Sequence, residues 1–319
     1  MSLCVLDGDL ISFKASAACE KRYIVATHKA SGRSKRFDNR TALRDWLKTQ
    51  DKWEESDFDI QDERDVSPIE NCLHTVKMMV QNISAATGCS ESKIVVQGSG
   101  NFRESLLLPT KYKGGREDMI KPFHLKEAQN YLKGKYKAEI ANGVESDDIL
   151  SMYAYEGYTK KKKIVQCSVD KDARQCMGWL YDWDKMSQPM FVSGLGELYL
   201  RPDGKLSGHG RKWLYVQGLV GDNADVYRPT ELSGARFGEK TAYKLLKDLD
   251  SDRACWSEIQ RLYKEWYSSP ISYTSWNGVP VEADYLDIMQ MYFTCAHMLR
   301  YEGDKIDVKS ILDKMGIEI

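Results

Sequence analysis

The chain has 319 residues, 46 basic and 47 acidic side chains, a net charge of −1 and 42% hydrophobic residues. This composition is typical of a globular protein long enough for one large domain or two ordinary domains, and it excludes disordered, collagen-like and fibrous proteins. No apolar run approaches the roughly 20 residues of a membrane-spanning helix, the first residues lack a secretory pattern, and the eight cysteines form no CxxC pair. We therefore expect a cytoplasmic protein with free thiols and no membrane partner.

The predicted elements alternate between strands and helices in the first two thirds of the chain. Short β-branched runs at 3–6, 94–97 and 164–169 predict buried strands, and one-sided apolar spacing predicts a helix at 68–87. A charged insertion, about 21–66, separates the first strand from that helix. From about residue 207 onward the pattern predicts helices, at 211–219, 239–249, 255–266 and 285–301. We expect the late aromatic residues to form the core of this helical region: Trp256, Tyr263, Trp266, Tyr267, Tyr273 and Trp276.

Acidic side chains follow the predicted strands at the points where the strands end. Asp7 and Asp9 follow the first strand, and Asp170 and Asp172 follow the third. The carboxyl ends of parallel strands form the ligand crevice of an open α/β sheet, so these four side chains should converge. Two further clusters can join them: Glu145, Asp147 and Asp148, and Asp222 and Asp225.

Each cluster alone has a structural explanation, because acids favour helix starts and the turns after strands. Together, nine carboxylates in one crevice would repel one another by roughly 4 kcal/mol per close pair at a dielectric near 20. Cations would relieve that repulsion, and oxygen ligands without Cys or His favour Mg²⁺ or Mn²⁺. Two such ions would suit hydrolysis of a phosphodiester.

Basic side chains gather in residues 111–137, where eight Lys and Arg stand against three acids. Such a run by itself is most often a solvated face. A second basic feature is a glycine turn at Gly238 that opens a helix with Lys240 in its first turn. Helix starts of this kind bind backbone phosphates, although glycine before a helix is also ordinary capping.

The ordered set of motifs resembles the flap endonuclease/5′→3′ exonuclease superfamily of PIN-like nucleases, and within it the exonucleases of short-tailed bacteriophages. The resemblance covers roughly residues 3–250 and rests on these segments in this order: Leu6-Asp7-Gly8-Asp9, Tyr112-Lys113-Gly114-Gly115-Arg116, Glu145-Ser146-Asp147-Asp148, Ser168-Val169-Asp170-Lys171-Asp172, Gly221-Asp222-Asn223-Ala224-Asp225 and Phe237-Gly238-Glu239-Lys240-Thr241-Ala242. It implies an α/β fold with a central, mainly parallel sheet flanked by helices. The implied nuclease domain spans 1–206 with a helical arch at about 103–140, and a helical DNA-binding region spans 207–319 with a helix–three-turn–helix at about 218–250.

The resemblance also implies roles for individual residues. Two Mg²⁺ ions, replaceable by Mn²⁺, would be held by two ligand sets: Asp7, Glu145, Asp147 and Asp148, and Asp170, Asp172, Asp222 and Asp225. Lys113 and Arg116 correspond to catalytic basic residues of the arch that grip the scissile phosphate. The implied DNA contacts are Lys111, Lys121, Arg236, Gly238, Lys240 and Lys244, with a potassium ion at the helix–three-turn–helix.

The activity implied is removal of nucleotides from DNA 5′ ends and cleavage of 5′ flaps, in phage replication, primer removal or recombination. The expected partner is DNA with a free 5′ end, a nick or a flap, with an RNA–DNA hybrid as a further candidate, and the expected state is a monomer in the host cytoplasm.

Two departures from the family pattern leave alternatives open. The stretch Gln97-Gly98-Ser99-Gly100-Asn101 has no carboxylate where the family has an Asp, and Arg236 replaces a glycine near the potassium site. A catalytically weak or inactive DNA-binding relative is one alternative. A haloacid dehalogenase-type phosphatase is another, which accounts for Asp7, Asp9 and Asp222 but not for the cluster at 145–148.

Overall fold

A six-stranded sheet organises the first part of the chain. In the computed structural model, which describes residues 2–50, 52–116 and 119–319, the strand order is β6-β5-β1-β7-β8-β9, and all neighbours are parallel except β8 and β9. The strands are β1 (Leu3–Asp7), β5 (Glu91–Gln97), β6 (Glu139–Ala141), β7 (Ile164–Cys167), β8 (Gly178–Tyr181) and β9 (Met190–Val192). The predicted α/β class with a mainly parallel central sheet is confirmed.

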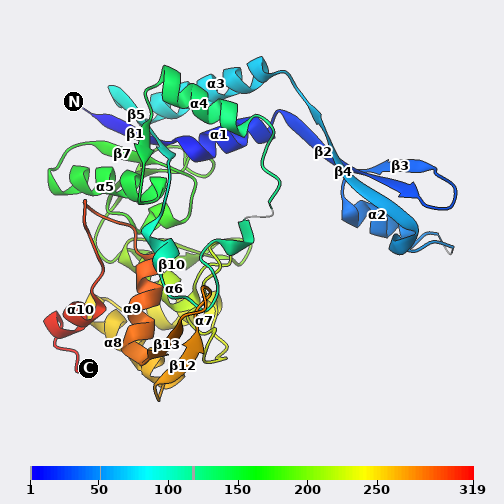
Figure 1. Ribbon diagram of the computed structural model, residues 1–319. Helices are drawn as coiled ribbons and strands as arrows, with labels where there is room; N and C mark the ends of the chain where they lie inside the picture. The colour runs from blue at the N-terminus through cyan, green and yellow to red at the C-terminus, as the bar shows by residue number, and fades with distance from the viewer. Residues whose placement is uncertain (1, 51, 117–118) are drawn as a thin grey trace.

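Helices cover both faces of this sheet (Figure 1). One face packs against α1 (Gly8–Ala17), α3 (Ile69–Thr87) and α4 (Leu125–Lys135), and the other packs against α5 (Ser146–Thr159). Strand β1 supplies Cys4 and Leu6 to the first core and Val5 to the second, as side-chain alternation along a strand requires. No helix in the described part of the chain is long and apolar enough to span a membrane.

The charged insertion folds as a projecting unit of its own, which we call the arm (residues 20–50 and 52–66). It consists of a three-stranded antiparallel sheet in the order β3-β2-β4 and one helix: β2 (Glu20–His28), β3 (Ser34–Phe37), α2 (Arg40–Leu47) and β4 (Phe58–Val66). A small core of its own includes Ile24, Phe37, Leu43 and Phe58. The arm extends away from the rest of the molecule on the right of Figure 1.

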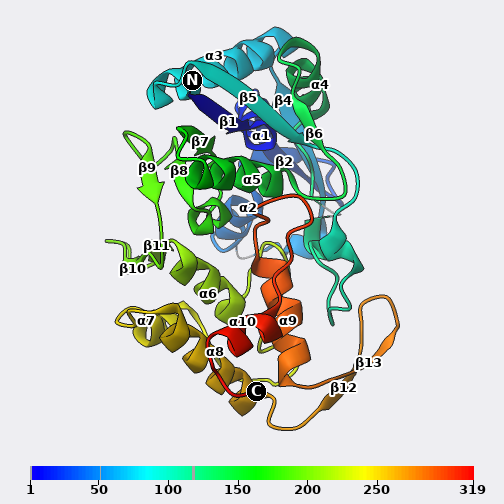
Figure 2. The same cartoon turned by 90° about the vertical axis from the view of Figure 1, so that its left-hand side faces the viewer.

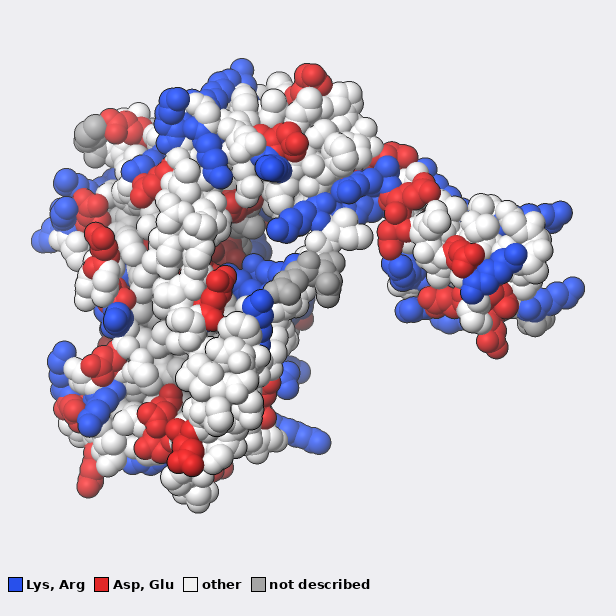
Figure 3. Space-filling view, viewed as in Figure 1, with Lys and Arg blue, Asp and Glu red and all other residues white. Residues whose placement is uncertain are grey.

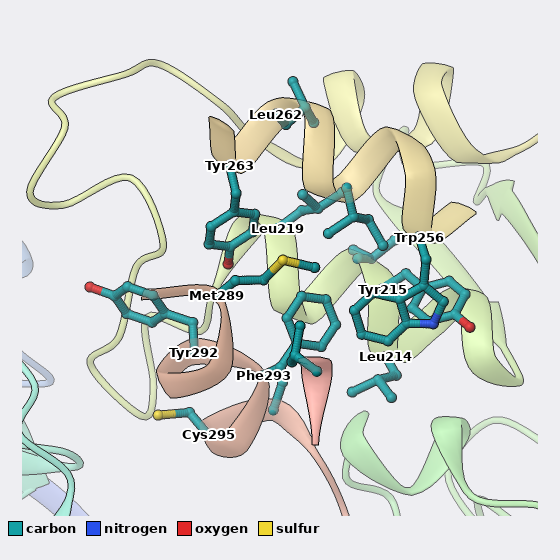
Figure 4. Close-up of a cluster of buried hydrophobic side chains, with 14 of the residues drawn as sticks. Leu214, Tyr215, Leu219, Trp256, Leu262, Tyr263, Met289, Tyr292, Phe293 and Cys295 are labelled. Carbon is teal, nitrogen blue, oxygen red and sulfur yellow. The ribbon is translucent and has the colours of Figure 1, made fainter. Parts of the chain in front are cut away.

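The C-terminal region lies below the sheet (Figure 2). Its elements are β10 (Glu197–Leu200), β11 (Leu206–His209), α6 (Arg211–Val220), α7 (Glu239–Leu246), α8 (Asp252–Trp266), β12 (Ile271–Thr274), β13 (Pro280–Ala283), α9 (Tyr285–Ala296) and α10 (Val308–Lys314). Figure 4 shows Tyr263, Trp256 and Phe293 packed together between α6, α8 and α9. A Cβ at Gly218 would lie 2.3 Å from the Phe293 ring, so only glycine permits this close approach of α6 and α9. Trp256, Tyr263 and Tyr267 are buried as expected, whereas Trp276 is 37% exposed.

The helix expected over 285–301 ends earlier, at Ala296. The side chain of Arg103, which is fully buried, donates to the carbonyl oxygens of Cys295 (3.1 Å) and His297 (2.5 Å). Beyond α9 the chain is extended at His297, with φ −73° and ψ 123°. The helix therefore ends where Arg103, a residue far away in the sequence, binds its last carbonyl groups. The sequence has no proline or glycine at 295–299 from which this end could have been predicted.

The segment predicted as a helical arch contains one α-helix, two short 3-10 helices and irregular chain between them. Its described residues form the short turns η2 (Phe102–Ser105) and η3 (Gly114–Arg116), and then α4, which packs into the core shared with α1 and α3. Glu117 and Asp118 of the basic segment lie outside the described residues. We call residues 106–116 and 119–124 the bridge, because this stretch connects the C-terminal region to the sheet and its helices (Figure 1).

Candidate metal centre and active site

Two adjoining hollows lie where β1 and β7 end and α5 begins. Their volumes are about 380 Å³ and about 280 Å³, and both are lined by Lys113, Glu145, Asp147 and Asp170. The larger also includes Asp7, Asp9 and Gln97, and the smaller includes Asp172, Asp222 and Asp225. The structure therefore brings seven of the eight predicted metal ligands to one place, as the strand-end argument predicted.

Asp7 and Asp147 both line the larger hollow. Asp7 caps α1, accepts hydrogen bonds from the Leu10 amide and the Ser168 hydroxyl (both 2.9 Å), and is 2% exposed. Burial, with the nearby charges of Asp9 and Asp170, raises the pKa of Asp7 to about 7.

Asp147 is the least satisfied carboxylate of the hollow. Its buried Oδ1 has no hydrogen-bond partner among the described residues. Burial raises the pKa of Asp147 well above its ordinary value, and the charges of Asp7, Asp170 and Glu145 raise it further. A buried oxygen without a partner is costly, so its orientation toward a cation would remove the penalty.

Three carboxylates form the second group. One oxygen each of Asp172, Asp222 and Asp225 lie within 4.8 Å of one another. Burial raises the pKa of Asp172 well above its ordinary value, with contributions from Asp170, Asp225 and Asp222. Asp170 lies beside both groups, because it lines both hollows and its Oδ1 accepts from the Asp172 amide at 2.8 Å.

The donor set fits hard divalent cations. The converging acidic side chains offer carboxylate oxygens, and among the described residues no His or Cys lines either hollow. Carboxylates that bind a cation tend to have unpaired oxygens and raised pKa values when the cation is absent. The buried Asp147 oxygen without a partner and the raised pKa of Asp172 agree with this expectation.

Lys113 and Arg116, the basic residues predicted to grip the scissile phosphate, reach over this acidic surface from the bridge. The Lys113 ammonium contacts Glu145, and the Arg116 guanidinium donates to Asp225 at 2.6 Å. The Lys113 amide also donates to the Asp225 carbonyl at 2.9 Å, and Lys113 has a φ of +56°. A non-glycine residue in this left-handed conformation is strained, which marks the position as one held by its surroundings.

Asp148, a predicted metal ligand, is bound by other groups of the protein in the structure. Its two oxygens accept a bidentate pair of hydrogen bonds from Arg103, at 2.7 and 2.9 Å, and neither side chain is exposed. The Glu145 and Leu299 amides donate to the same carboxylate at 3.1 Å. Four hydrogen bonds leave no free lone pair directed at the cavity, and Asp148 lines neither hollow.

The stretch after β5 that lacks a carboxylate has a structural role instead. A Cβ at Gly98 would lie 2.2 Å from the Asn142 side chain and 2.6 Å from the Ala141 carbonyl, so an Asp has no room there. The Gln97 side chain accepts from the Ser146 amide at 2.9 Å. Asn101 donates to Glu145 at 2.7 Å. These neutral amides hold the start of α5, and with it Glu145 and Asp147, in position.

The sequence reasoning missed several residues that shape the site. Besides Arg103, Gln97 and Asn101, these are Tyr112, whose hydroxyl donates to Asp225 at 2.9 Å, and Lys171, whose ammonium lies 2.9 Å from Asp222. Lys171 stands between two predicted ligands in the sequence and could have been found from that position. The others follow no local pattern, because their partners lie far along the chain.

The predicted DNA contacts fall into two places. A hollow of about 830 Å³ adjoins the second carboxylate group through Asp222 and extends to Arg236 and Gly238, which caps α7. Lys240 and Lys244 are exposed on α7. Lys111, on the bridge, lies with its ammonium 5.4 Å from the centre of the Trp276 ring. Lys121 is exposed near the arm, so the structure does not group it with the others. Figure 3 shows basic side chains along the hollowed face between the upper and lower parts of the body.

Comparisons with known proteins give similarity at the level of structure. No protein-family model and no curated protein sequence matches the chain. The chain is similar to bacteriophage T5 proteins. A complex of T5 D15 flap endonuclease with DNA and metal ions is 13% identical, with 99% of this chain and 96% of that chain covered and a TM-score of 0.48. The T5 D15 protein co-crystallised with metal ions is 14% identical over 99% and 97% of the two chains, with a TM-score of 0.47. T5 5′-exonuclease with zinc bound is 14% identical over the same shares, with a TM-score of 0.42.

Proposed function

We propose that this chain is a divalent-metal-dependent nuclease, with 5′→3′ exonuclease and 5′-flap endonuclease activity and Mg²⁺ as its natural ion. The observation that carries the proposal is the convergence of seven carboxylates on two adjoining hollows beneath Lys113 and Arg116. Such a site suits a phosphodiester substrate. Metal ions held by the carboxylates would contact the phosphate from one side, and the positively charged Lys113 and Arg116 side chains would contact it from the other.

In the proposed reaction, the carboxylates hold the metal ions, and Lys113 and Arg116 bind the scissile phosphate. One cation would be held by Asp7, Glu145 and Asp147, and the other by Asp170, Asp172, Asp222 and Asp225. When bound, a pair of divalent cations supplies an activated water and neutralises charge on the leaving 3′ oxygen. Lys113 and Arg116 neutralise Glu145 and Asp225 in the structure, and they would exchange these partners for a nonbridging oxygen of the scissile phosphate.

The substrate we propose is DNA with a free 5′ end, a nick or a 5′ flap, with the RNA strand of a hybrid as a second candidate. The hollow that extends from Asp222 to Gly238 offers a path for a duplex backbone from the carboxylates to the start of α7. The names of the similar T5 proteins, flap endonuclease and 5′-exonuclease, agree with this choice. We place the activity in phage replication, primer removal or recombination, in a monomer acting in the host cytoplasm.

The decisive experiment is cleavage of a nicked duplex and a 5′-flap duplex, each labelled at the 3′ end of the cut strand. We expect labelled products shortened from the 5′ end in Mg²⁺ or Mn²⁺ and none in EDTA. The matched control is Asp147→Asn, which should bind the same DNA and not cleave it. Binding without cleavage by the wild-type protein in both metals would instead support an inactive relative, and hydrolysis of a small phosphomonoester alone would support the phosphatase alternative.

A further inference from the structure

The bridge that carries Lys113 and Arg116 is held at both ends. At its first end, the Trp276 indole donates to the Leu106 carbonyl at 3.0 Å and the Trp276 amide donates to the Leu108 carbonyl at 2.8 Å. The Tyr112 hydroxyl and the Lys113 amide both bind Asp225. The first half of the bridge is therefore fastened to the C-terminal region, through the β12–β13 hairpin and the loop after α6 (Figure 2).

The second end of the bridge is fastened to the root of the arm, at Glu20. This residue begins β2, its side chain is only 2% exposed, and its Oε2 accepts the Phe123 amide at 2.8 Å. Arg22 and Arg64 pair with the same carboxylate at 2.5 and 3.2 Å. Burial alone raises the pKa of Glu20, but the hydrogen bonds from Phe123 and the two arginines outweigh it and lower the pKa overall. Glu20 is thus a buried, ionised acceptor for a bridge amide.

The opposite strand of the arm reinforces this attachment. Arg64 stands opposite Arg22 in the β2–β4 register, and its Nη1 donates to the Lys121 carbonyl at 3.2 Å. Its guanidinium lies 5.2 Å from the centre of the Phe123 ring. Just beyond β4, the Ser67 carbonyl lies 2.8 Å from the His124 imidazole nitrogen. Both long strands of the arm therefore meet the bridge where it leaves the site.

We expect the attachment at Glu20 to have its largest effect when metal ions and substrate occupy the site. If cations occupied Glu145 and Asp225, Lys113 and Arg116 would lose these carboxylate partners, and Arg116 would keep its hydrogen bond to the Ala224 carbonyl. The bridge would then depend on its remaining contacts, and only six residues lie between Arg116 and Phe123. A chain of this length spans at most about 25 Å, so the anchored end limits how far Arg116 can move.

We propose that the root of the arm, through Glu20 and Arg64, positions the bridge so that Lys113 and Arg116 stand over the carboxylates during cleavage. Glu20 is a positioning residue in this scheme, because it acts through the Phe123 amide and touches no substrate. The inference rests on the proposed nuclease function for its kinetic consequence, whereas the attachment itself can be measured without any activity.

The test compares Glu20→Ala and Glu20→Gln with the control Glu63→Ala. The exposed side chain of Glu63 lies on β4 of the same arm and accepts a hydrogen bond from the Tyr23 hydroxyl. Hydrogen–deuterium exchange of the peptide covering 119–125 reports on the Phe123 amide. We expect faster exchange in Glu20→Ala, an intermediate rate in Glu20→Gln, which keeps an acceptor oxygen, and the wild-type rate in Glu63→Ala. On the flap substrate, kcat should fall about tenfold in Glu20→Ala with a smaller change in KM.

Wild-type exchange and wild-type kcat in Glu20→Ala would overturn the inference while leaving the nuclease proposal intact. Absence of cleavage by the wild-type protein would reject the nuclease proposal, and exchange would still decide whether Glu20 holds the bridge. If Glu20→Ala does not fold, Arg64→Ala provides the same comparison, since it removes the contact with the Lys121 carbonyl and retains the Glu20 acceptor. Unchanged exchange and kcat in Arg64→Ala and Glu20→Gln together would also overturn the inference.

Discussion

The arm and the two adjoining hollows of the site both contain many acidic side chains, but the surroundings of the two sets differ. Away from its root at Glu20, the arm holds acids in solvent-accessible ion pairs: Arg36 with Asp65 at 2.8 Å, Arg40 with Asp62 at 2.9 Å, and Arg44 with Glu55 at 2.9 Å. Hydrogen bonds from Arg36 and Arg44 lower the pKa of Asp65 and of Glu55. In the cavity, burial and mutual repulsion raise the pKa of Asp7, Asp147 and Asp172.

The difference shows that charge density alone does not indicate a site. Exposed, paired acids give a solvated surface with little effect on stability. Buried acids that repel one another destabilise the protein unless a ligand compensates them, which is why they mark function. The following predictions test this contrast, from the largest expected effect to the smallest.

Asp147→Asn should abolish cleavage and stabilise the metal-free protein. Loss of a ligand to a catalytic metal should cost about 4 kcal/mol of transition-state stabilisation, about a thousandfold in rate. The same change removes a buried charge that repels Asp7 and Asp170. We expect the Tm in EDTA to rise and the Mg²⁺-induced rise in Tm to shrink, as measured by differential scanning fluorimetry. A lower Tm in EDTA would contradict the view that this carboxylate is strained.

Arg103→Met should destabilise the fold by about 3–5 kcal/mol, because it leaves the buried Asp148 carboxylate unpaired. Urea denaturation measures this change in the free energy of unfolding. The matched variant, Arg103→Met with Asp148→Leu, should recover a large part of the loss. Strong destabilisation that persists in the double variant would mean that other contacts dominate: those of Arg103 with the Cys295 and His297 carbonyls, and those of Asp148 with the Glu145 and Leu299 amides.

Lys113→Ala should slow cleavage about a hundredfold, the cost of losing one electrostatic contact to a transition state. The metal-induced rise in Tm should persist, because Lys113 is not a ligand. Single-turnover cleavage of the flap substrate measures the rate. A rate near that of the wild-type protein would exclude a direct role of Lys113 at the scissile phosphate.

Asp304 is a buried acid that is fully paired, so it should behave like the acids of the arm but with a larger effect. Burial alone raises its pKa, yet hydrogen bonds from Arg300 and His297 lower the pKa far below the ordinary range. Its contribution to stability is present above the unfolded-state pKa of about 4 and is lost as the pH falls further. Asp304→Asn should therefore cost about 1–3 kcal/mol at pH 7. The difference from the wild-type protein in urea midpoints should shrink toward pH 3, and a pH-independent difference would reject the ionic explanation.

Arg40→Ala, in the arm, should change the free energy of unfolding by only about 0.5 kcal/mol, since both Arg40 and Asp62 are more than 40% exposed. Cleavage should be unaffected. The activity of this variant is measured beside that of Glu63→Ala. A large loss of activity would show that the outer part of the arm contacts the substrate, in addition to the role of its root in positioning the bridge.

The sequence by itself determined the alternation of strands and helices and the placement of carboxylates at the ends of β1 and β7. These features depend on side-chain periodicity and on the common direction of parallel strands, and both are local or topological properties. The one-sided apolar spacing likewise predicted α3 closely, at Ile69–Thr87.

Only the tertiary structure decided which of two neighbouring acids is available to a metal. Asp147 and Asp148 are adjacent in α5, but the helix directs one toward the cavity and the other toward Arg103, 45 residues away. The early end of α9 and the attachment of the bridge to Glu20 depend on contacts of the same long range. Burial and pairing are set by what packs against a residue, and the linear pattern of charges does not contain that information.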